Sequence, residues 1–290
     1  MRLEEHVPLA RMTTIGTGGP ARWLGRPRTS AELEELLRWA DGEGISVATV
    51  GLGSNLLAAD EGVDALVLRL EGHLASVQVD GHTLAAGGGA ANAVCLHRAR
   101  SAGLGGLEFA CAIPGTAGGG VRMNAGAYGS DWKAVLRRAL VATADGSDWL
   151  GPEGLGLEYR RSRLEPGQVV ASVEFALQPR DPDEIKADVR ALNAKRKAAQ
   201  PINRRTFGSV FKNPDHEFSA GRLLEACGMK GHRIGGAQVS PRHANFIENA
   251  DGATTADALA LMAEARRRAR EQFGIELEHE VVLVGPAELT

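Results

Sequence analysis

Two glycine-rich stretches have residue types that could bind a phosphate-bearing ligand, and the longer lies at 106–129. It reads GLEFACAIPGTAGGGVRMNAGAYG and carries only two charged residues, Glu108 and Arg122. Ile113-Pro114-Gly115 predicts a turn, because proline fixes its φ and glycine permits a positive φ. Gly118, Gly119 and Gly120 leave backbone N–H groups without side chains, so they could form an anion-binding nest. A glycine-rich but mostly apolar stretch in mid-chain favours a large flat ligand with a diphosphate over a polar linker.

The second stretch is Gly51-Leu52-Gly53-Ser54-Asn55, which follows a β-branched run at 46–50. Its glycine backbone and the Ser54 and Asn55 side chains could hold a phosphate. A plain β-turn explains the same residues equally well. The pattern is neither the dinucleotide fingerprint G-x-G-x-x-G nor a Walker loop. Two glycine loops of non-Rossmann type therefore constrain the ligand more than either loop alone.

Polar groups in the second half of the chain have both an ordinary and a functional interpretation. Arg160 and Arg161 form a pair, and surface arginines are usually solvated. GSVFKNP at 208–214 predicts a short strand closed by an Asn-Pro turn, or else a site for a phosphorylated, carboxylated substrate. MKGHR at 229–233 is a basic turn suited to a diphosphate. The glutamates of 276–280 alternate, which is typical of a solvated strand face, although Glu280 begins an apolar run.

The elements that must position these residues follow from hydrophobic spacing and cap residues. Thr29 with Glu32 fits a capping box that begins a helix. This helix lies between strands at 21–24 and 46–50, so the second strand of a β-α-β unit opens into the glycine loop. We expect further strands at 65–70, 75–79, 83–86, 169–177 and 275–284, and helices at 90–101, 183–198, 219–226 and from Thr254 or Thr255 onward.

Composition excludes several classes of protein. The 290 residues are 43% hydrophobic and 24% charged with net charge −3, which provides no electrostatic footprint for nucleic acid. The first residues lack the apolar core of a signal peptide, and no run of 18 apolar residues could span a membrane. Three cysteines far apart argue for a reducing cytoplasm rather than a disulfide framework. We expect a cytoplasmic protein with no metal and no obligate protein partner.

The motifs taken together resemble one enzyme family. GLGSN at 51–55, GLEFACAIPGTAGGGV at 106–121 and NAGAYG at 124–129 resemble the flavin-binding region of UDP-N-acetylenolpyruvoylglucosamine reductases. The resemblance continues over nearly the whole chain, in TTIGTGGPA at 13–21, YRRS at 159–162, GSVFKNP at 208–214 and ELEHEV at 276–281. The flavin domains of this family are similar to those of the vanillyl-alcohol oxidase superfamily, which binds FAD without a Rossmann fold.

The resemblance implies an α+β fold with a bipartite FAD-binding domain and a smaller α+β substrate domain. The expected boundaries are 1–66 and 67–180 for the two FAD-binding lobes and 181–290 for the substrate domain, whose last strand near 280 could pack back at the flavin. The implied cofactors are FAD and NADPH. The implied reaction reduces the enolpyruvyl group of UDP-N-acetylglucosamine enolpyruvate to UDP-N-acetylmuramate, a step of peptidoglycan synthesis on which cell shape and division depend.

The resemblance also assigns roles to individual residues. Arg160 would stabilise charge on the substrate carboxylate, Ser209 would give a proton to C2, and Glu280 would bind the same group or position Arg160. The expected substrate-binding residues are Lys212, Asn213, Lys230, Gly231 and His243. The expected cofactor-binding residues are Gly51, Gly53, Ser54, Asn55, Leu56, Ile113, Pro114, Gly115, Thr116, Gly118, Gly119, Asn124, Ala125 and Gly126.

The chain departs from the family pattern at two points. The family's amino-terminal motif commonly reads Thr-Thr-Phe-Arg-x-Gly-Gly-Pro-Ala, whereas Ile15 and Gly16 stand here in place of the Phe and Arg. The only tyrosines, Tyr128 and Tyr159, lie inside other motifs, which indicates the shorter form of the family without a tyrosine loop over the uridine. Two other functions remain: a hydroxy-acid or alcohol oxidase, which should lack GSVFKNP and the terminal Glu-Val, and a non-catalytic nucleotide-binding protein, which should lack Arg160, Ser209 and Glu280.

Overall fold

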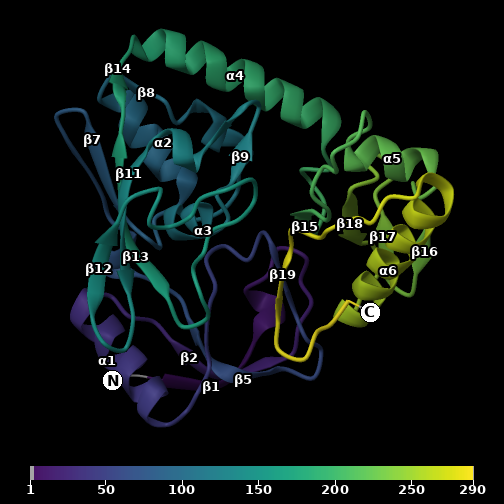
Figure 1. The fold of residues 1–290 in the computed structure, drawn as a ribbon, viewed down its shortest axis with the longest axis horizontal. Coiled ribbons are helices and arrows are strands. Elements are labelled where there is room, and N and C mark those ends of the chain that lie inside the picture. Colours follow the sequence, from purple (N-terminus) through teal and green to yellow (C-terminus); the bar gives the residue numbers. More distant parts are fainter. Residues whose placement is uncertain (1–2, 290) are drawn as a thin grey trace. The chain divides into compact units, whose positions relative to one another are not determined.

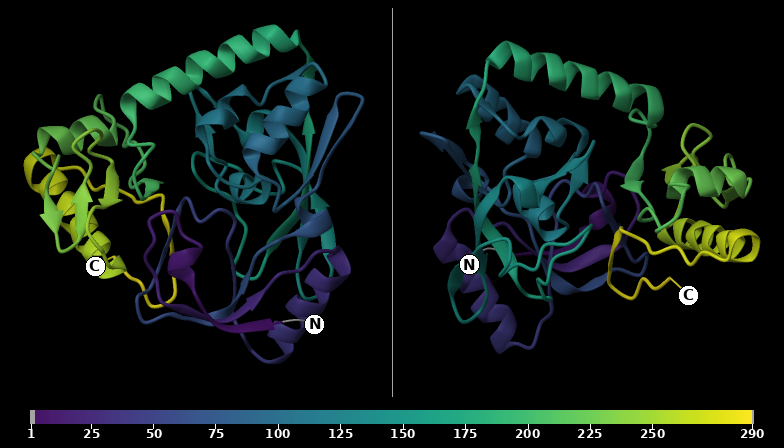
Figure 2. Two further views of the ribbon diagram at one scale, coloured as in Figure 1. Left: turned by 180° about the vertical axis from the view of Figure 1, so that it is seen from behind. Right: turned by 45° about the horizontal axis from the view of Figure 1, so that its top comes forward.

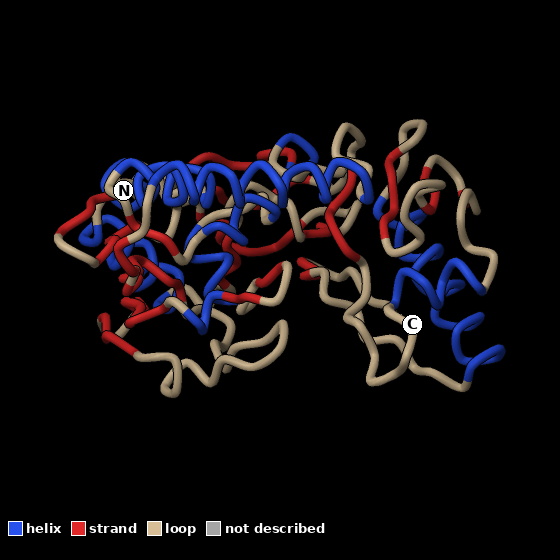
Figure 3. Tube along the Cα trace, turned by 90° about the horizontal axis from the view of Figure 1, so that it is seen from above, coloured by secondary structure: helices blue, strands red, loops and turns tan. Residues whose placement is uncertain are grey.

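The computed structural model describes residues 3–289, which form two compact units (Figure 1). The first unit holds the chain up to Glu5, Trp23–Leu52 and Ala65–Arg196. The second holds His6–Arg22, Gly53–Asp64 and the chain from Lys197 onward. Helices and strands are mixed along the whole described chain (Figure 3), so the predicted α+β class is confirmed. The predicted division into two FAD-binding lobes and a substrate domain stays a prediction.

The larger sheet of the first unit is antiparallel. Its strands are, in order, β12 (Ser147–Leu150), β11 (Leu136–Ala142), β13 (Val169–Ala176), β7 (Thr83–Gly87) and β6 (Val77–Asp80). The helices α2 (Asn92–Ser101) and α3 (Ala117–Arg122) pack against it. Trp132 fills the core, stacked on Phe175 at 4.9 Å between ring centroids and edge-on to Phe109 at 5.4 Å. These rings supply large buried areas that fix α3, and hence residues 116–120, against β13.

A second, four-stranded sheet begins in the amino-terminal part of the chain. It has the order β1 (Leu3–Pro8), β2 (Pro20–Gly25), β5 (Val63–Leu68), β3 (Val47–Thr49), and the boundary between the units passes through β1, β2 and β5. The helix α1 (Ser30–Gly42) buries the predicted apolar face. Thr29 caps it by accepting from Glu32 N at 3.2 Å, as predicted. The second half of the predicted capping box is wrong, because Glu32 accepts from Arg28 N instead of from the cap residue.

The second unit is built on a small antiparallel sheet and two helices. The sheet order is β15 (Thr206–Ser209), β18 (Phe246–Asn249), β17 (Ala237–Val239), β16 (Arg233–Ile234). The helix α6 (Thr255–Phe273) packs beside this sheet (Figure 2), and α5 (Ala220–Ala226) packs on α6. A parallel pair, β4 (Leu56–Ala58) with β19 (Val282–Val284), completes the unit. Phe207, Phe211 and Met262 lie in its core, fully or almost fully buried.

The remaining elements are short, apart from one long helix. The helix α4 (Pro182–Ala199) carries the chain from the first unit to the second. Two short antiparallel pairs are β8 (Leu104–Gly105) with β14 (Gln178–Pro179), and β9 (Gly126–Ala127) with β10 (Ser130–Asp131). Single 3₁₀ turns lie at Leu9–Arg11, Gly72–Ala75, Glu108–Ala112 and Trp132–Ala134.

The predicted glycine nest is wrong in its backbone conformation. Gly118, Gly119 and Gly120 lie in the helix α3 rather than in an open loop. Their N–H groups are also not bare: Gly118 N donates to Gly88 O at 2.8 Å, Gly119 N to Thr116 Oγ1 at 3.3 Å and Gly120 N to Thr116 O at 2.8 Å. Gly118 and Gly120 are instead needed for close packing, because a Cβ would lie 2.9 Å from Gly88 O on Gly118 and 1.9 Å from Trp132 Nε1 on Gly120.

The last predicted strand is shorter than expected. The range 275–284 contains a strand only at Val282–Val284, which pairs with β4 in parallel. Before it, the chain is held by separate hydrogen bonds to the segment that follows Ser209. Isolated bonds of this kind satisfy the backbone without forming a continuous ladder.

The amino-terminal threonine motif supports the start of α6. Thr255 Oγ1 donates to Ala58 O at 2.7 Å and pairs with Thr17 Oγ1 at 2.8 Å. Asp60 accepts from the N–H groups of Thr255 and Ala256, both at 2.9 Å, which satisfies two orphan donors of the helix terminus. Ile15, which replaces the family's phenylalanine, is completely buried in the core of the second unit. The motif is therefore a structural element of this unit.

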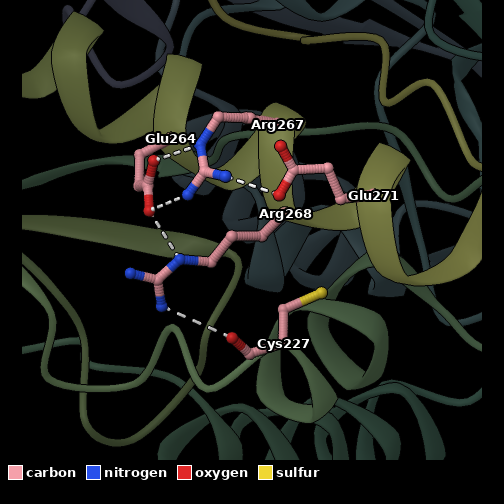
Figure 4. A network of polar contacts seen from close by, with 5 residues as sticks. All are labelled: Cys227, Glu264, Arg267, Arg268 and Glu271. Carbon is pink, nitrogen blue, oxygen red and sulfur yellow. Dashed lines mark hydrogen bonds and ion pairs between the residues drawn. The ribbon is translucent and has the colours of Figure 1, made fainter.

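An ion-pair network on α6 predicts a small acid sensitivity of stability (Figure 4). Hydrogen bonds from Arg267, at 2.8 Å, and Arg268, at 2.6 Å, lower the pKa of Glu264 to about 2. Because the pKa is depressed on folding, the stabilisation exists above the unfolded value and is lost as the pH falls from about 4.5 to about 2. We expect Glu264→Gln to lower the free energy of unfolding at pH 7 by at most about 1 kcal/mol. Urea unfolding at pH 7 and pH 3 should show the difference shrinking, and a constant difference would contradict the ionic origin.

Candidate functional site

The first unit brings the predicted turn at 113–116 next to the start of the glycine loop. A Cβ on Gly51 would lie 2.7 Å from Thr116 Oγ1, so the two segments are in direct contact. Asn92 anchors the turn, since its Nδ2 donates to Ile113 O at 3.0 Å and its backbone N to Gly115 O at 3.0 Å. The sequence reasoning missed Asn92. The one sequence feature that could have indicated its role is that Asn92 is a polar residue on the otherwise apolar face of its helix.

Asn124 connects the predicted flavin motif NAGAYG with the arginine pair. Its Nδ2 donates to Asp131 Oδ2 at 3.1 Å and to Glu158 O at 2.8 Å, and its Oδ1 accepts from Lys133 N at 2.9 Å. Both amide protons are therefore used inside the protein. The side chain of Asn124 has no donor left for a cofactor, and only the second lone pair of Oδ1 remains as an acceptor.

Arg160 lies beside the same motif. Its Nη2 donates to Gly126 O at 2.5 Å, and its guanidinium carbon lies 5.0 Å from the centre of the Tyr159 ring. Its φ of +53° is in the left-handed region, where a side chain other than glycine is strained by about 1–2 kcal/mol. Strain of this kind persists where surrounding contacts enforce it, which is common at functional sites. Arg161, in contrast, is exposed and exchanges backbone hydrogen bonds with Glu158.

In the second unit, the rest of the glycine loop holds the predicted catalytic glutamate. Gly53 has a φ of +66°, and a Cβ there would lie 2.0 Å from Met12 O, so only glycine fits. Asn55 Nδ2 donates to Glu280 O at 2.9 Å, and Val282 N donates back to Asn55 O at 3.1 Å. The loop thus fixes the backbone on which Glu280 stands.

Ser209 lies next to this pair. Glu280 N donates to Val210 O at 2.9 Å, and a Cβ on Gly208 would lie 3.2 Å from Ser54 O. Ser209 is half-buried, and its hydroxyl has no hydrogen-bond partner among residues 3–289. The second unit therefore brings together Ser54 and Asn55 of the glycine loop, Ser209 and Glu280, which are far apart in the sequence.

The predicted substrate-binding residues lie in the second unit, and the two lysines are already paired. Lys212 forms an ion pair with Glu278 at 2.5 Å, and Lys230 with Glu225 at 2.6 Å. Asn213 Oδ1 accepts from Ala220 N at 3.0 Å, at the first turn of α5. Gly231 makes a turn with φ +75°. Both lysines could exchange an exposed glutamate for a phosphate, because a surface pair contributes little.

His243 is half-buried between α5 and β18. Its Nδ1 accepts from Asn245 N at 3.2 Å, and its ring lies edge-on to Phe246 at 4.9 Å between centroids. Burial, and to a lesser extent the nearby Lys230 ammonium, lower the pKa of His243 below its usual value. The neutral ring with its proton on Nε2 is the form compatible with the Asn245 contact.

Two observations are compatible with a cofactor bound at the glycine-rich stretch 106–129. A Cβ on Gly119 would meet only Thr116 Oγ1, at 3.3 Å, so this face of α3 is open. Asn92 Oδ1 is buried and has no hydrogen-bond partner among the described residues, while the other amide atom of the same side chain holds Ile113. A buried acceptor without a partner can be satisfied by a hydroxyl group of a ligand or by water. The residues present are thus compatible with FAD.

The two adjacent glycines provide a test that separates folding from cofactor binding. We expect Gly120→Ala to destabilise the protein by about 1–3 kcal/mol or more, because its Cβ would overlap Trp132. Gly119→Ala should change the stability much less, since alanine favours the helix and its Cβ would only press on the Thr116 hydroxyl, at 3.3 Å. The same substitution should lower the amount of FAD that copurifies. Thermal unfolding and flavin absorbance check this, and normal flavin content in Gly119→Ala would contradict a cofactor contact there.

Comparison with known proteins decides the family. Residues 200–284 match the family model for the C-terminal domain of UDP-N-acetylenolpyruvoylglucosamine reductase, and residues 22–148 match an FAD binding domain. UDP-N-acetylenolpyruvoylglucosamine reductase 2 of Symbiobacterium thermophilum is 46% identical over 286 residues, which are 98% of this chain and 92% of that protein. The chain belongs to the UDP-N-acetylenolpyruvoylglucosamine reductase family.

Other members extend this result to the fold. The reductase of Bacillus licheniformis is 40% identical over 285 residues, which cover 97% of this chain and 93% of the relative. The crystal structure of the reductase from Thermus caldophilus superposes with a TM-score of 0.86 at 37% identity and covers 98% of this chain and 99% of its own. The predicted family, the FAD-dependent oxidoreductase class and the FAD domain are confirmed. The oxidase alternative is not favoured. Within residues 3–289 we find no helix long and apolar enough to cross a membrane.

Proposed function

We propose that this chain, with NADPH and FAD, reduces the enolpyruvyl group of UDP-N-acetylglucosamine enolpyruvate to UDP-N-acetylmuramate. The observation that carries the proposal is the cluster of the second unit, in which the backbone of Glu280 bonds to Asn55 of the glycine loop and to Val210, the residue after Ser209. The near full-length similarity to reductases of this name supports it. A non-catalytic nucleotide-binding protein would not need these residues to be brought together.

FAD would be held by the two lobes at 1–66 and 67–180, and the substrate by the domain at 181–290. When bound, FAD supplies the hydride for C3 of the enolpyruvyl group, with NADPH as the reductant. The protein supplies orientation and electrostatics. The contacts to the cofactor are assigned to Gly51, the loop 53–56, the turn 113–116, Gly118, Gly119 and the segment 124–126.

Arg160 is assigned to the carboxylate of the substrate. Negative charge develops at C2 and spreads into this carboxylate while C3 is reduced. The planar guanidinium can donate two parallel hydrogen bonds to a carboxylate, and a fixed cation stabilises charge that develops in the transition state. The contact with Gly126 O orients the guanidinium before the substrate binds.

Ser209 is assigned to the proton that C2 must receive. A serine hydroxyl is a weak acid, so it needs neighbours that stabilise the alkoxide or relay a proton. Lys212 is three residues away in the chain and could contribute positive charge. Glu280 would bind the carboxyl group if protonated or position Arg160 if ionised. Lys230, Gly231, His243 and Asn213 are assigned to the remaining substrate contacts.

In the cell, we place the reaction in the cytoplasm, in peptidoglycan synthesis, and thereby in cell shape and division. The experiment is product analysis with the purified holoenzyme. NADPH and UDP-N-acetylglucosamine enolpyruvate should be consumed one to one, and mass spectrometry should find a product that has gained two hydrogen atoms. NADPH oxidation without this product would contradict the proposal.

A further inference from the structure

Asn245 pairs with the backbone directly after Ser209 in the way a neighbouring strand would. Its Oδ1 accepts from Phe211 N at 2.9 Å, and its Nδ2 donates to Phe211 O at 2.8 Å. The amide plane of the side chain therefore takes the place of a peptide group. Asn245 is 4% exposed, so both bonds are shielded from water. Neither the glycine motifs nor the family's catalytic set accounts for this residue.

The backbone of Asn245 extends the same contact. Its carbonyl oxygen accepts from Val210 N at 2.9 Å, and its N–H donates to His243 Nδ1 at 3.2 Å. One residue thus satisfies three polar groups of Val210 and Phe211. The strands flanking this point are not in regular register: Thr206 pairs with Glu248 and Ser209 with Phe246, with an irregularity between them. The ladder ends at the Ser209–Phe246 pair, and beyond this end the Asn245 side chain supplies the pairing for Phe211.

The held segment connects the two proposed catalytic residues of the second unit. Ser209 directly precedes Val210, and Val210 O accepts the hydrogen bond from Glu280 N. Lys212 N continues the contact by donating to Glu278 O at 2.9 Å. A shift of Val210 and Phe211 would therefore move Ser209 and Glu280 relative to each other. Misplacement of reacting groups by about 1 Å can cost about 10²-fold in rate.

We propose that Asn245 is a positioning residue that sets the placement of Ser209 and Glu280 for the protonation step. This inference rests on the proposed function, since it takes Ser209 as the proton donor. Asn245 acts only through the Val210–Phe211 backbone and touches no reacting atom. Its loss would leave the N–H and C=O of Phe211 unpaired in a buried place, so the segment would relax towards other partners.

The test compares Asn245→Ala and Asn245→Gln with a matched control. Asn245→Gln keeps both amide groups but moves them outward by one methylene, which guards against a simple failure to fold. The control is Asn249→Ala at the end of β18, the strand that Asn245 directly precedes. Asn249 also makes two bonds to backbone, donating to Ile15 O at 3.0 Å and accepting from Ala253 N at 2.9 Å, away from Val210 and Phe211. Thermal unfolding of all three variants measures the general loss of stability.

Two measurements test whether Asn245 positions Ser209 and Glu280. In stopped flow, reduction of FAD by NADPH should stay within about twofold in the Asn245 variants, while reoxidation by substrate should slow by about 10–10²-fold. Amide hydrogen exchange without substrate should speed up at 209–212 and 278–281 but not in β17. Asn249→Ala should leave reoxidation and these amides unchanged.

The outcomes separate this inference from the proposed function. The positioning role is overturned if both Asn245 variants reoxidise at the wild-type rate. It is also overturned if both half-reactions slow only in proportion to the loss of stability, as judged against Asn249→Ala. Ser209→Ala is measured in parallel. If its reoxidation is slow while the Asn245 variants are normal, only the positioning role fails. If Ser209→Ala reoxidises normally, the assignment of Ser209 itself fails.

Discussion

Ser209→Ala is expected to leave the reduction of FAD by NADPH nearly normal and to slow reoxidation by UDP-N-acetylglucosamine enolpyruvate by about 10²–10⁴-fold. This is the range for loss of a positioned general acid. The reason is that the proton on C2 is needed only when the substrate is reduced. The Ser209 hydroxyl has no hydrogen-bond partner among residues 3–289, so its proton is available to a ligand. Anaerobic stopped flow of each half-reaction measures the two effects separately.

Two further variants control this experiment. Ser209→Cys should retain part of the reoxidation rate, because a thiol can also give a proton. Thr206→Val removes a hydroxyl from the same strand, where Thr206 Oγ1 is buried and has no partner within the described chain. It should be neutral in both half-reactions. If Ser209 has no part in the reaction, Ser209→Ala should leave both half-reactions intact.

Arg160→Lys should slow reoxidation by about 10²–10³-fold, the usual effect of losing a donor that stabilises transition-state charge. An ammonium keeps the charge but cannot reproduce the two parallel hydrogen bonds of a guanidinium. It also cannot hold the contact with Gly126 O in the same geometry. Reduction by NADPH should change much less. The same stopped-flow experiment gives both rates.

The neighbouring Arg161 is the matched control for charge. It is exposed, and its backbone, rather than its guanidinium, bonds to Glu158. Arg161→Lys should therefore leave both half-reactions unchanged. If Arg161→Lys is impaired and Arg160→Lys is not, the two arginines have exchanged roles.

The sequence was most informative where local chemistry decides the structure. The sequence predicts Thr29 and Ser219 as helix caps and a helix that starts at Thr254 or Thr255; Thr29, Ser219 and Thr254 each accept a capping backbone hydrogen bond. The strand at 169–177 was found almost to the residue, because its apolar run is buried on both faces for much of its length. Capping and burial depend on neighbours in the chain or on hydrophobicity alone, and both can be read from sequence.

The conformation of the glycine run 118–120 could not be predicted from local sequence. Three consecutive glycines have low helix propensity, so a loop was expected. The segment is nevertheless helical, and glycine is required at two of the three positions because Trp132 and the backbone at Gly88 leave no room for a Cβ. These partners lie far away in sequence, and tertiary packing overrides local propensity. Within residues 116–122 the one local helix signal is the cap residue Thr116, whose hydroxyl accepts from Gly119 N.

The candidate site depends on the same kind of long-range contact. The bonds of Asn55 to Glu280, and of Glu280 to Val210, join parts of the chain separated by 225 and 70 residues. Hydrophobic periodicity cannot predict such pairs. The family resemblance placed Ser209 and Glu280 in one site, whereas the supporting contacts of Asn92 and Asn245 became visible only in the structure.

The central claim is that FAD on this protein takes electrons from NADPH and delivers them to an enolpyruvyl nucleotide sugar. It is tested most directly by following the flavin absorbance of the wild-type holoenzyme under anaerobic conditions. We expect NADPH to bleach the flavin, and UDP-N-acetylglucosamine enolpyruvate to restore the absorbance, while lactate-type keto acids do not. Recovery that is as fast with a keto acid as with the nucleotide sugar, or no recovery with the nucleotide sugar, would contradict the account.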